Sequence, residues 1–270
     1  MIKDLCFEII NSFSNDCVFS LPYSSNDKTK MVDLNLFKKT IDHLLSDGKI
    51  KEISLSGGEP LLHPNIFEMI SYCKERNIKV ILFTSVVIKK NDIDETYDNY
   101  TFSGIDKKDL FLLKEVGLDK IVFKLQEFEV DNYSEEFKNQ FNCVADSMLK
   151  ASLFGLDIDV HFVPLKTNYK KFKEIVEISE MCGVKNISVL NFVPQEKDKE
   201  LMLTEEEMLE FIKIYKEVKD KFSGVIKVTP SLSKDSHLCS SGLEKVKKHN
   251  ETRGKTLCKL LFWLNKPTNY

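Results

Sequence analysis

Short apolar segments rich in β-branched residues alternate along the chain with longer segments in which apolar residues recur every three or four positions. The short segments predict strands, and the longer ones predict amphipathic helices. The predicted strands cover residues 5–10, 53–56, 79–85, 120–125, 157–163, 186–192 and 225–228. The predicted helices cover residues 33–48, 64–77, 106–116, 135–154, 169–181 and 204–222. Thr204 and Glu207 form a capping box at the start of the last helix, and residues 89–104 are expected to be irregular.

Strands and helices in this strict alternation are typical of parallel βαβ units. Six such units predict an α/β fold, namely a partial (β/α)6 barrel of the TIM type with parallel strands, with a seventh short strand at one edge. A chain of 270 residues is long enough for one such barrel, which we assign to residues 1–230, and a short C-terminal extension, residues 231–270. In such barrels the functional residues lie in the loops after the carboxyl ends of the strands.

Charge and cysteine usage narrow the class of protein. The formal net charge is -3, and Arg76 and Arg253 are the only arginines, so we expect no nucleic-acid partner. No secretory signal pattern opens the chain and no apolar run approaches the length of a membrane span, so we expect no membrane partner. Seven scattered cysteines favour a reducing compartment, and we expect a cytoplasmic protein.

The segment from Ser56 to Pro60 contains the most distinctive turn of the sequence, placed between a predicted strand and a predicted helix. Gly57 and Gly58 would let the backbone approach a ligand closely, and Glu59 offers an acceptor for a cationic donor such as an ammonium group. A tight connection between strand and helix, without any ligand, is the alternative interpretation.

A second segment, residues 10–20, follows the first predicted strand. Together with Gly57 to Pro60 and the strand ends at 160–164 and 189–195, it resembles the radical S-adenosylmethionine (SAM) superfamily over residues 5–194. In that family a C-x3-C-x2-C loop binds a 4Fe-4S cluster, and the cluster cleaves SAM to a 5'-deoxyadenosyl radical. The resemblance implies that Gly57, Gly58, Glu59 and Pro60 bind SAM, with Glu59 taking its ammonium group.

The three cluster positions of the family loop are occupied here by Phe13, Cys17 and Ser20. Phenylalanine cannot bind iron, and a serine oxygen is a poor substitute for a thiolate. We therefore expect that Cys17 is vestigial, that neither cluster nor SAM is bound, and that the chain is a degenerate or repurposed binding protein for a peptide, a nucleoside-like ligand or a partner enzyme. The alternative is an active radical SAM enzyme that modifies a peptide or protein.

Two further positions depart from the family pattern. Lys124 ends the fourth strand facing inward, near the expected SAM ribose, and Asn191 stands where related strand ends often carry a cation. We expect Lys124 to pair with Glu59 in place of the missing cofactor, while Phe13 fills the volume of the absent cluster. A solvated lysine is the alternative.

Two other groups of residues leave alternatives open. Cys239 and Cys258 in the tail resemble the start of an auxiliary-cluster (SPASM-like) extension, but two cysteines cannot hold a 4Fe-4S cluster alone. Asp159, His161 and Lys124 could serve an ordinary barrel enzyme that uses general acid-base chemistry.

Overall fold

The computed structural model describes residues 4–11, 31–46, 50–86, 88–90, 101–125, 135–192, 194 and 196–228. The chain divides after Lys227 into two units. All described residues except Val228 belong to the first unit, which is described here by itself.

Seven strands form one open sheet whose spatial order follows the sequence, β1-β2-β3-β6-β7-β8-β9. The strands are β1 (Asp4–Ile10), β2 (Glu52–Gly57), β3 (Lys79–Thr84), β6 (Lys120–Lys124), β7 (Asp157–Phe162), β8 (Asn186–Val189) and β9 (Val225–Val228). Neighbours from β1 to β8 pair in parallel. The prediction of an α/β partial barrel with parallel strands is therefore confirmed.

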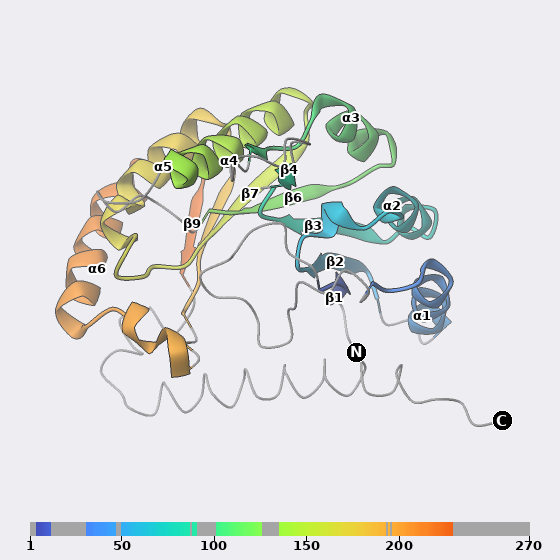
Figure 1. Cartoon of the computed structure of the whole chain (residues 1–270), viewed down its shortest axis with the longest axis horizontal. Coiled ribbons are helices and arrows are strands. Elements are labelled where there is room, and N and C mark those ends of the chain that lie inside the picture. Colours follow the sequence, from blue (N-terminus) through green and yellow to red (C-terminus); the bar gives the residue numbers. More distant parts are fainter. Residues whose placement is uncertain are drawn as a thin grey trace, which may run out of the picture. The chain divides into compact units, whose positions relative to one another are not determined.

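The helices lie along the outer side of this curved sheet (Figure 1). They are α1 (Leu34–Ser46), α2 (Ile66–Lys74), α3 (Lys107–Glu115), α4 (Glu135–Leu153), α5 (Phe172–Met181) and α6 (Glu205–Lys219), with the short 3-10 helices η1 (Pro60–Leu62), η2 (Tyr169–Lys171) and η3 (Glu196–Leu201). The predicted capping box is present, because Thr204 accepts from the Glu207 N–H while the Glu207 side chain accepts from the Thr204 N–H.

Apolar side chains from alternate strand positions fill the space between sheet and helices. Phe7 of β1 packs edge-on against Phe37 of α1, with ring centroids 5.4 Å apart. At the other side of the sheet, Phe162 of β7 stacks on Phe172 of α5 at 5.1 Å, and Phe172 meets Phe211 of α6 at 5.2 Å. These apolar side chains occupy the face of the sheet that the helices cover. The side chains at the alternate strand positions point to the opposite face.

One prediction about local structure was wrong. Within the segment expected to be irregular, β4 (Ile88–Lys90) and β5 (Thr101–Ser103) pair as a small antiparallel sheet. Each strand has three residues and a single large apolar side chain, so neither shows the apolar alternation from which a strand is recognised in a sequence. Pairing partners, and not the local pattern, make these two segments strands.

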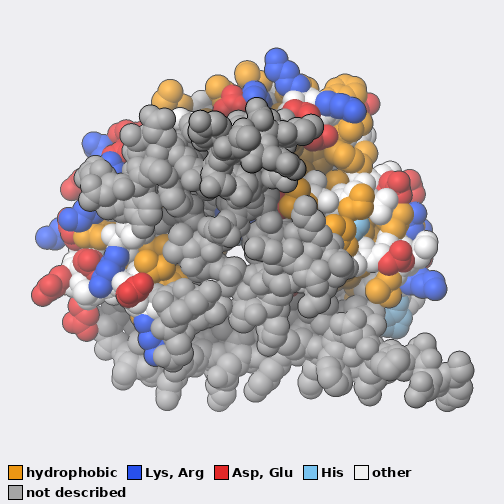
Figure 2. Space-filling model, in the orientation of Figure 1, with side chains coloured by type: hydrophobic (Ala, Val, Ile, Leu, Met, Phe, Trp, Pro, Cys, Tyr) orange, Lys and Arg blue, Asp and Glu red, His pale blue; other side chains and the backbone are white. Residues whose placement is uncertain are grey.

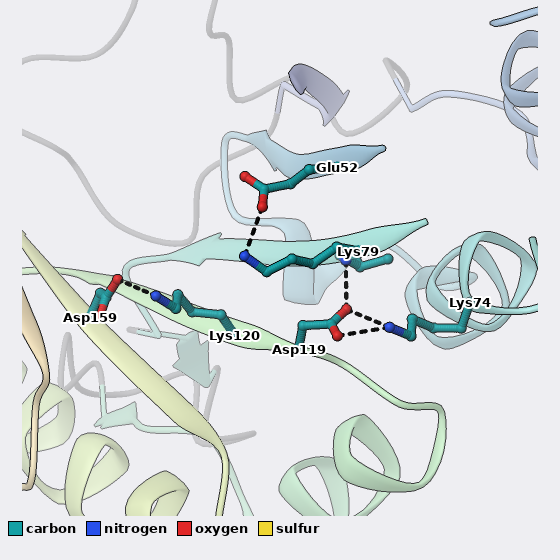
Figure 3. Close-up of polar contacts among 7 residues, drawn as sticks. Glu52, Lys74, Lys79, Asp119, Lys120 and Asp159 are labelled. Carbon is teal, nitrogen blue, oxygen red and sulfur yellow. Dashed lines mark hydrogen bonds and ion pairs between the residues drawn. The ribbon is translucent and has the colours of Figure 1, made fainter. Parts of the chain in front are cut away.

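Polar ties, by which we mean ion pairs and hydrogen bonds made by side chains on or next to the strands, join the strands near their amino ends (Figure 3). Lys79 of β3 pairs with Glu52 of β2 at 2.7 Å. Asp119, just before β6, accepts from the Val80 N–H of β3 at 2.7 Å and pairs with Lys74 at 2.6 Å. These charges are satisfied within the fold, far from the loops after the carboxyl ends of the strands.

The described surface carries charges of both signs. On the face shown in Figure 2, lysines and acidic residues are intermingled around the helical rim. None of the helices in the described part of the chain has the length and apolar character needed to cross a membrane.

Candidate functional site on the concave face of the sheet

The candidate site consists of the strand residues that point away from the helices. Because side chains alternate between the faces of a strand, the residues next to the buried apolar positions lie on the concave face. Register places Glu8 beside Ser56, and Lys124, His161 and Ser188 in one row across β6, β7 and β8. This face therefore carries charged and hydroxyl groups where the opposite face is apolar.

The turn after β2 brings the ends of β1 and β2 into close contact. The Gly58 N–H donates to the Ile10 carbonyl at 2.7 Å. Gly57 has a φ of +129°, and a Cβ built on it would lie 2.0 Å from the Ile10 oxygen. Only glycine fits there. The two segments singled out in the sequence thus start from neighbouring strand ends, although residues 13–20 themselves lie outside the described residues.

Glu59 is fully buried, and donors from the end of β3 surround its carboxylate. Its Oε1 accepts from the Thr84 hydroxyl at 2.6 Å and from the Leu61 N–H at 3.2 Å. Its Oε2 accepts from both the N–H and the hydroxyl of Ser85, each at 2.8 Å. In this structure the carboxylate fastens the β2 turn to the end of β3.

The segment that Glu59 holds is strained. Val86 has a φ of +62°, which a β-branched residue rarely adopts. Its N–H donates to Thr84 Oγ1 at 2.8 Å and to Glu59 Oε2 at 3.3 Å, and its side chain is buried. Such a conformation persists only where the surroundings hold it, and here Thr84 and Glu59 both accept from the Val86 N–H.

The expected ion pair between Lys124 and Glu59 is not formed among the described residues, and that prediction was wrong. Glu59 takes its hydrogen bonds from uncharged donors of β3 and η1. The charge of Lys124 acts instead on Glu8 of β1 and on His161 of β7. Burial raises the pKa of Glu8 above its usual value, and the nearby Lys124 charge opposes that rise.

His161 lies between charges of opposite sign on the concave face. Burial lowers its pKa from 6.5 to about 4, Lys124 adds to the decrease, and Asp159 opposes it. The ring meets Phe83 of β3 edge-on, with centroids 5.0 Å apart. The imidazole is therefore neutral at neutral pH and can donate or accept a hydrogen bond.

The His161 pKa predicts an acid sensitivity. Since the folded pKa of about 4 lies below the unfolded value of 6.5, His161 costs no stability above pH 6.5 and progressively more as the pH falls toward 4. Between neutral pH and about pH 4.5, wild-type protein should lose about 2 to 3 kcal/mol more unfolding free energy than the His161→Gln variant. Urea titrations of both proteins at the two pH values test this, and equal losses would show that the histidine is charged in the fold.

Asp159, the third member of the acid-base alternative, is committed elsewhere. Its Oδ2 pairs with Lys120 at 2.6 Å, and its Oδ1 accepts from the Asn186 amide at 2.8 Å. The Lys120 and Asp159 side chains are 19% and 14% exposed. The carboxylate therefore serves the polar ties at the amino ends of the strands, while His161 and Lys124 lie further along the same face.

The remaining predicted site residues fall into two groups. Pro60 is buried at the start of η1, and Asn191 is partly exposed two residues after β8. Phe13, Cys17, Ser20, Cys239 and Cys258 lie outside the described residues. The assignments of these residues, and of Gly57, Gly58, Glu59 and Lys124, to metal or cofactor binding stay predictions.

The described cysteines do not assemble a metal centre. Across the described ranges, no group of three or more His, Cys, Asp or Glu side chains could hold a metal ion. Burial raises the pKa of the Cys73 thiol to about 12 and also raises the pKa of Cys143 and Cys182. Because the thiolate is the form that binds metals, these three thiols suit packing.

Sequence reasoning missed three residues of the candidate site. Glu8 is the one acidic side chain that alternates with the apolar residues of β1 between Phe7 and Ile10, and this placement on the inward face was the available signal. Thr84 and Ser85, the partners of Glu59, carried no signal of their own, because short hydroxyl residues are common at strand ends.

Comparison with known proteins gives a family and a fold. A family model described as the radical SAM superfamily matches residues 14–179. An uncharacterized protein of Methanocaldococcus jannaschii is 25% identical over 206 residues, covering 73% of this chain and 65% of the relative. A probable GTP 3',8-cyclase of the same organism is 26% identical over 156 residues, covering 55% of this chain and 45% of the relative. The chain thus spans about half to two thirds of the length of these curated relatives.

Among solved structures, SuiB of Streptococcus suis bound to the precursor peptide SuiA superposes with a TM-score of 0.63. The sequences are 14% identical, and the match covers 84% of this chain and 48% of SuiB. At this identity the likeness shows the fold.

Proposed function

Because the chain belongs to the radical SAM superfamily, with 166 of its 270 residues inside the matched range 14–179, we propose that it is a member without the radical-generating cluster that acts as a ligand-binding protein. One observation carries the proposal. The family's three cluster positions hold Phe13, Cys17 and Ser20, so the loop offers a single thiol.

The residues present do not fit a 4Fe-4S cluster of the family type. Such a cluster uses three thiolates from one short loop and leaves its fourth iron open for SAM. Two of those thiolates are missing, and the described cysteines lie in or directly after helices or, in the case of Cys6, on β1. Glu59 fits a SAM ammonium no better, since its two oxygens already accept from five donors.

A peptide or a partner enzyme is the ligand class that we infer for this protein. The support is the fold shared with SuiB, whose structure is described as bound to the precursor peptide SuiA. The concave face carries both charges and an aromatic ring, which suits a ligand with mixed polar and apolar groups.

An active radical SAM enzyme that modifies a peptide is the second candidate. The intact Gly57 to Pro60 turn and the tail cysteines Cys239 and Cys258 favour it. This candidate needs a cluster ligated in a way that differs from the family loop.

Iron content separates the two candidates. After anaerobic reconstitution with iron and sulfide, wild-type protein should be colourless and bind far less than the about four iron atoms per chain that a 4Fe-4S cluster requires. The Phe13→Cys/Ser20→Cys double variant restores three thiols and should turn brown with about four irons per chain.

The matched control adds Cys17→Ser to the double variant and should lose the colour again. Stoichiometric iron and sulfide in wild-type protein would overturn the proposal and establish the second candidate as the better one. A colourless double variant would mean that the loop does not have the family's geometry.

A further inference from the structure

The rim at the amino ends of the strands carries the most exposed apolar side chains of the described part of the chain. Because each helix runs back antiparallel to the strands, the C-terminal ends of α4 and α5 lie at this rim. Met181 at the end of α5 is 80% exposed and Leu153 at the end of α4 is 78% exposed, more than any other large apolar side chain in the described ranges. Single exposed apolar side chains are common, whereas a group of them marks an interaction surface.

The ends of α4 and α5 are in contact, which makes this part of the rim one continuous surface. A Cβ built on Gly183, just after α5, would lie 3.1 Å from the hydroxyl oxygen of Ser152 near the end of α4. Leu153 follows Ser152 directly, and Met181 lies two residues before Gly183. The two exposed side chains therefore belong to helix ends that touch each other.

Met181 also lines an apolar groove between α5 and α6, two helices that pack side by side (Figure 1). The groove has a volume of about 430 Å³. Its apolar lining is completed by Val176 of α5, Val218 of α6 and Phe222 just after α6, which are each between 4% and 6% exposed. The rim thus offers both protruding apolar side chains and a recess that can receive one.

The charged side chains around the groove balance one another. Two lysines, Lys173 and Lys221, and two glutamates, Glu177 and Glu180, complete its lining. Lys173 lies 3.9 Å from Glu177, and Glu180 accepts from the Ser223 N–H at 3.0 Å. Such a surface has no net charge with which to select a strongly acidic or basic partner, whereas a second copy of the chain brings the same balanced set. A two-fold axis also lets the protruding side chains of each copy enter the groove of the other.

We propose that this rim, formed by the ends of α4 and α5 and by the groove between α5 and α6, is the interface of an isologous homodimer. A groove of this size with two protruding side chains makes a small interface, so we expect a dissociation constant of about 1 to 100 µM. The interface lies at the amino ends of the strands and leaves the loops after their carboxyl ends free. The proposal therefore does not depend on the proposed function.

Sedimentation velocity of the full chain from about 1 to 200 µM tests the proposal. Wild-type protein should change from monomer to dimer over this range. Leu153→Lys and Met181→Lys should each raise the dissociation constant at least about tenfold, because a lysine would enter an apolar contact. Leu209→Lys is the matched control, since Leu209 is 61% exposed but lies near the start of α6, at the opposite end from the rim. It should dimerise like the wild type, and unchanged unfolding midpoints should show that all three variants fold.

Oxidation of methionines by hydrogen peroxide, followed by mass spectrometry, shows what covers the rim in the unmodified protein. Met181 should oxidise quickly at about 1 µM protein and more slowly at about 200 µM, where the dimer protects it. Met202 is 43% exposed and lies outside the rim, so its rate should not depend on protein concentration. Met69 is fully buried and supplies the slow reference rate.

A chain that stays monomeric at every concentration would overturn the proposal, and so would a dimer that survives both lysine substitutions at the rim. Protection of Met181 that is equal at all concentrations would mean that another part of the same chain covers it. Rapid oxidation at all concentrations would leave the rim open to a different partner. Either oxidation result would rule out the second copy as the occupant.

Discussion

The Gly57→Ala variant is expected to lose more than about 4 kcal/mol of unfolding free energy, enough to prevent accumulation of folded protein if the wild type is of ordinary stability. The added Cβ would lie 2.0 Å from the Ile10 carbonyl oxygen, and the φ of +129° is unfavourable for an L side chain. Gly57 and the Ile10 carbonyl both belong to the backbone at the paired ends of β2 and β1. Neither can move without breaking the hydrogen bonds between these two strands. Soluble yield and circular dichroism measure the effect.

Gly155→Ala is the matched control. Gly155 also has a positive φ, +72°, but the nearest atom to an added Cβ is the flexible end of Lys114 at 3.6 Å. Its cost should be limited to the backbone conformation, about 1 to 2 kcal/mol. If the two variants were equally stable, the close approach of Gly57 to Ile10 would not exist in solution.

The Glu59→Ala variant is expected to lose about 3 to 5 kcal/mol. It leaves the buried Thr84 hydroxyl and the partly buried N–H and hydroxyl of Ser85 without their acceptor, and it removes one of the two acceptors of the Val86 N–H. Equilibrium unfolding in urea measures the change. Substitution of a residue that served only to bind a ligand would change the unfolding free energy little in this assay. The size of the loss therefore distinguishes a structural role of Glu59 from a ligand-binding role.

Glu52→Gln provides the comparison for Glu59. Glu52 forms an ion pair with Lys79 in which the lysine side chain is 48% exposed, and the removal of such a pair costs about 0 to 1 kcal/mol. A Glu59→Ala loss as small as this would contradict the hydrogen-bond arrangement described above.

The architecture could be predicted from the sequence because its strands and helices carry strong periodic signals. The strand at Val225–Val228 and the capping box at Thr204 lie where the pattern puts them. Strand order also followed from the pattern, since successive βαβ units place each new strand beside the last. Boundaries were less accurate: α2 begins at Ile66, after a 3-10 helix at Pro60, and not at Pro64.

The candidate site was predicted only in part because its contacts join residues that are far apart in the sequence. The sequence identifies Glu59 but cannot show that Thr84 and Ser85, on another strand, surround it. It likewise cannot show that the charge of Lys124 acts on the pKa of Glu8, because β2 and β3 lie between their strands. The sequence shows which residue types are present, whereas only the folded structure shows which residues contact one another.

During folding, parallel strands must find their alignment after long connections, and a slip by one residue would turn every inward side chain outward. The polar ties near the amino ends oppose such slips one strand at a time. Glu52 with Lys79 aligns β2 and β3, Asp119 aligns the start of β6 with Val80 of β3, and Asp159 joins β7 to Lys120 of β6 and Asn186 of β8. A slipped strand would bury its tie residue among the apolar side chains under the helices. The polar ties at the amino ends therefore specify which alignment forms, and at the carboxyl ends the hydrogen bonds of Glu59 to Thr84 and Ser85 hold that alignment.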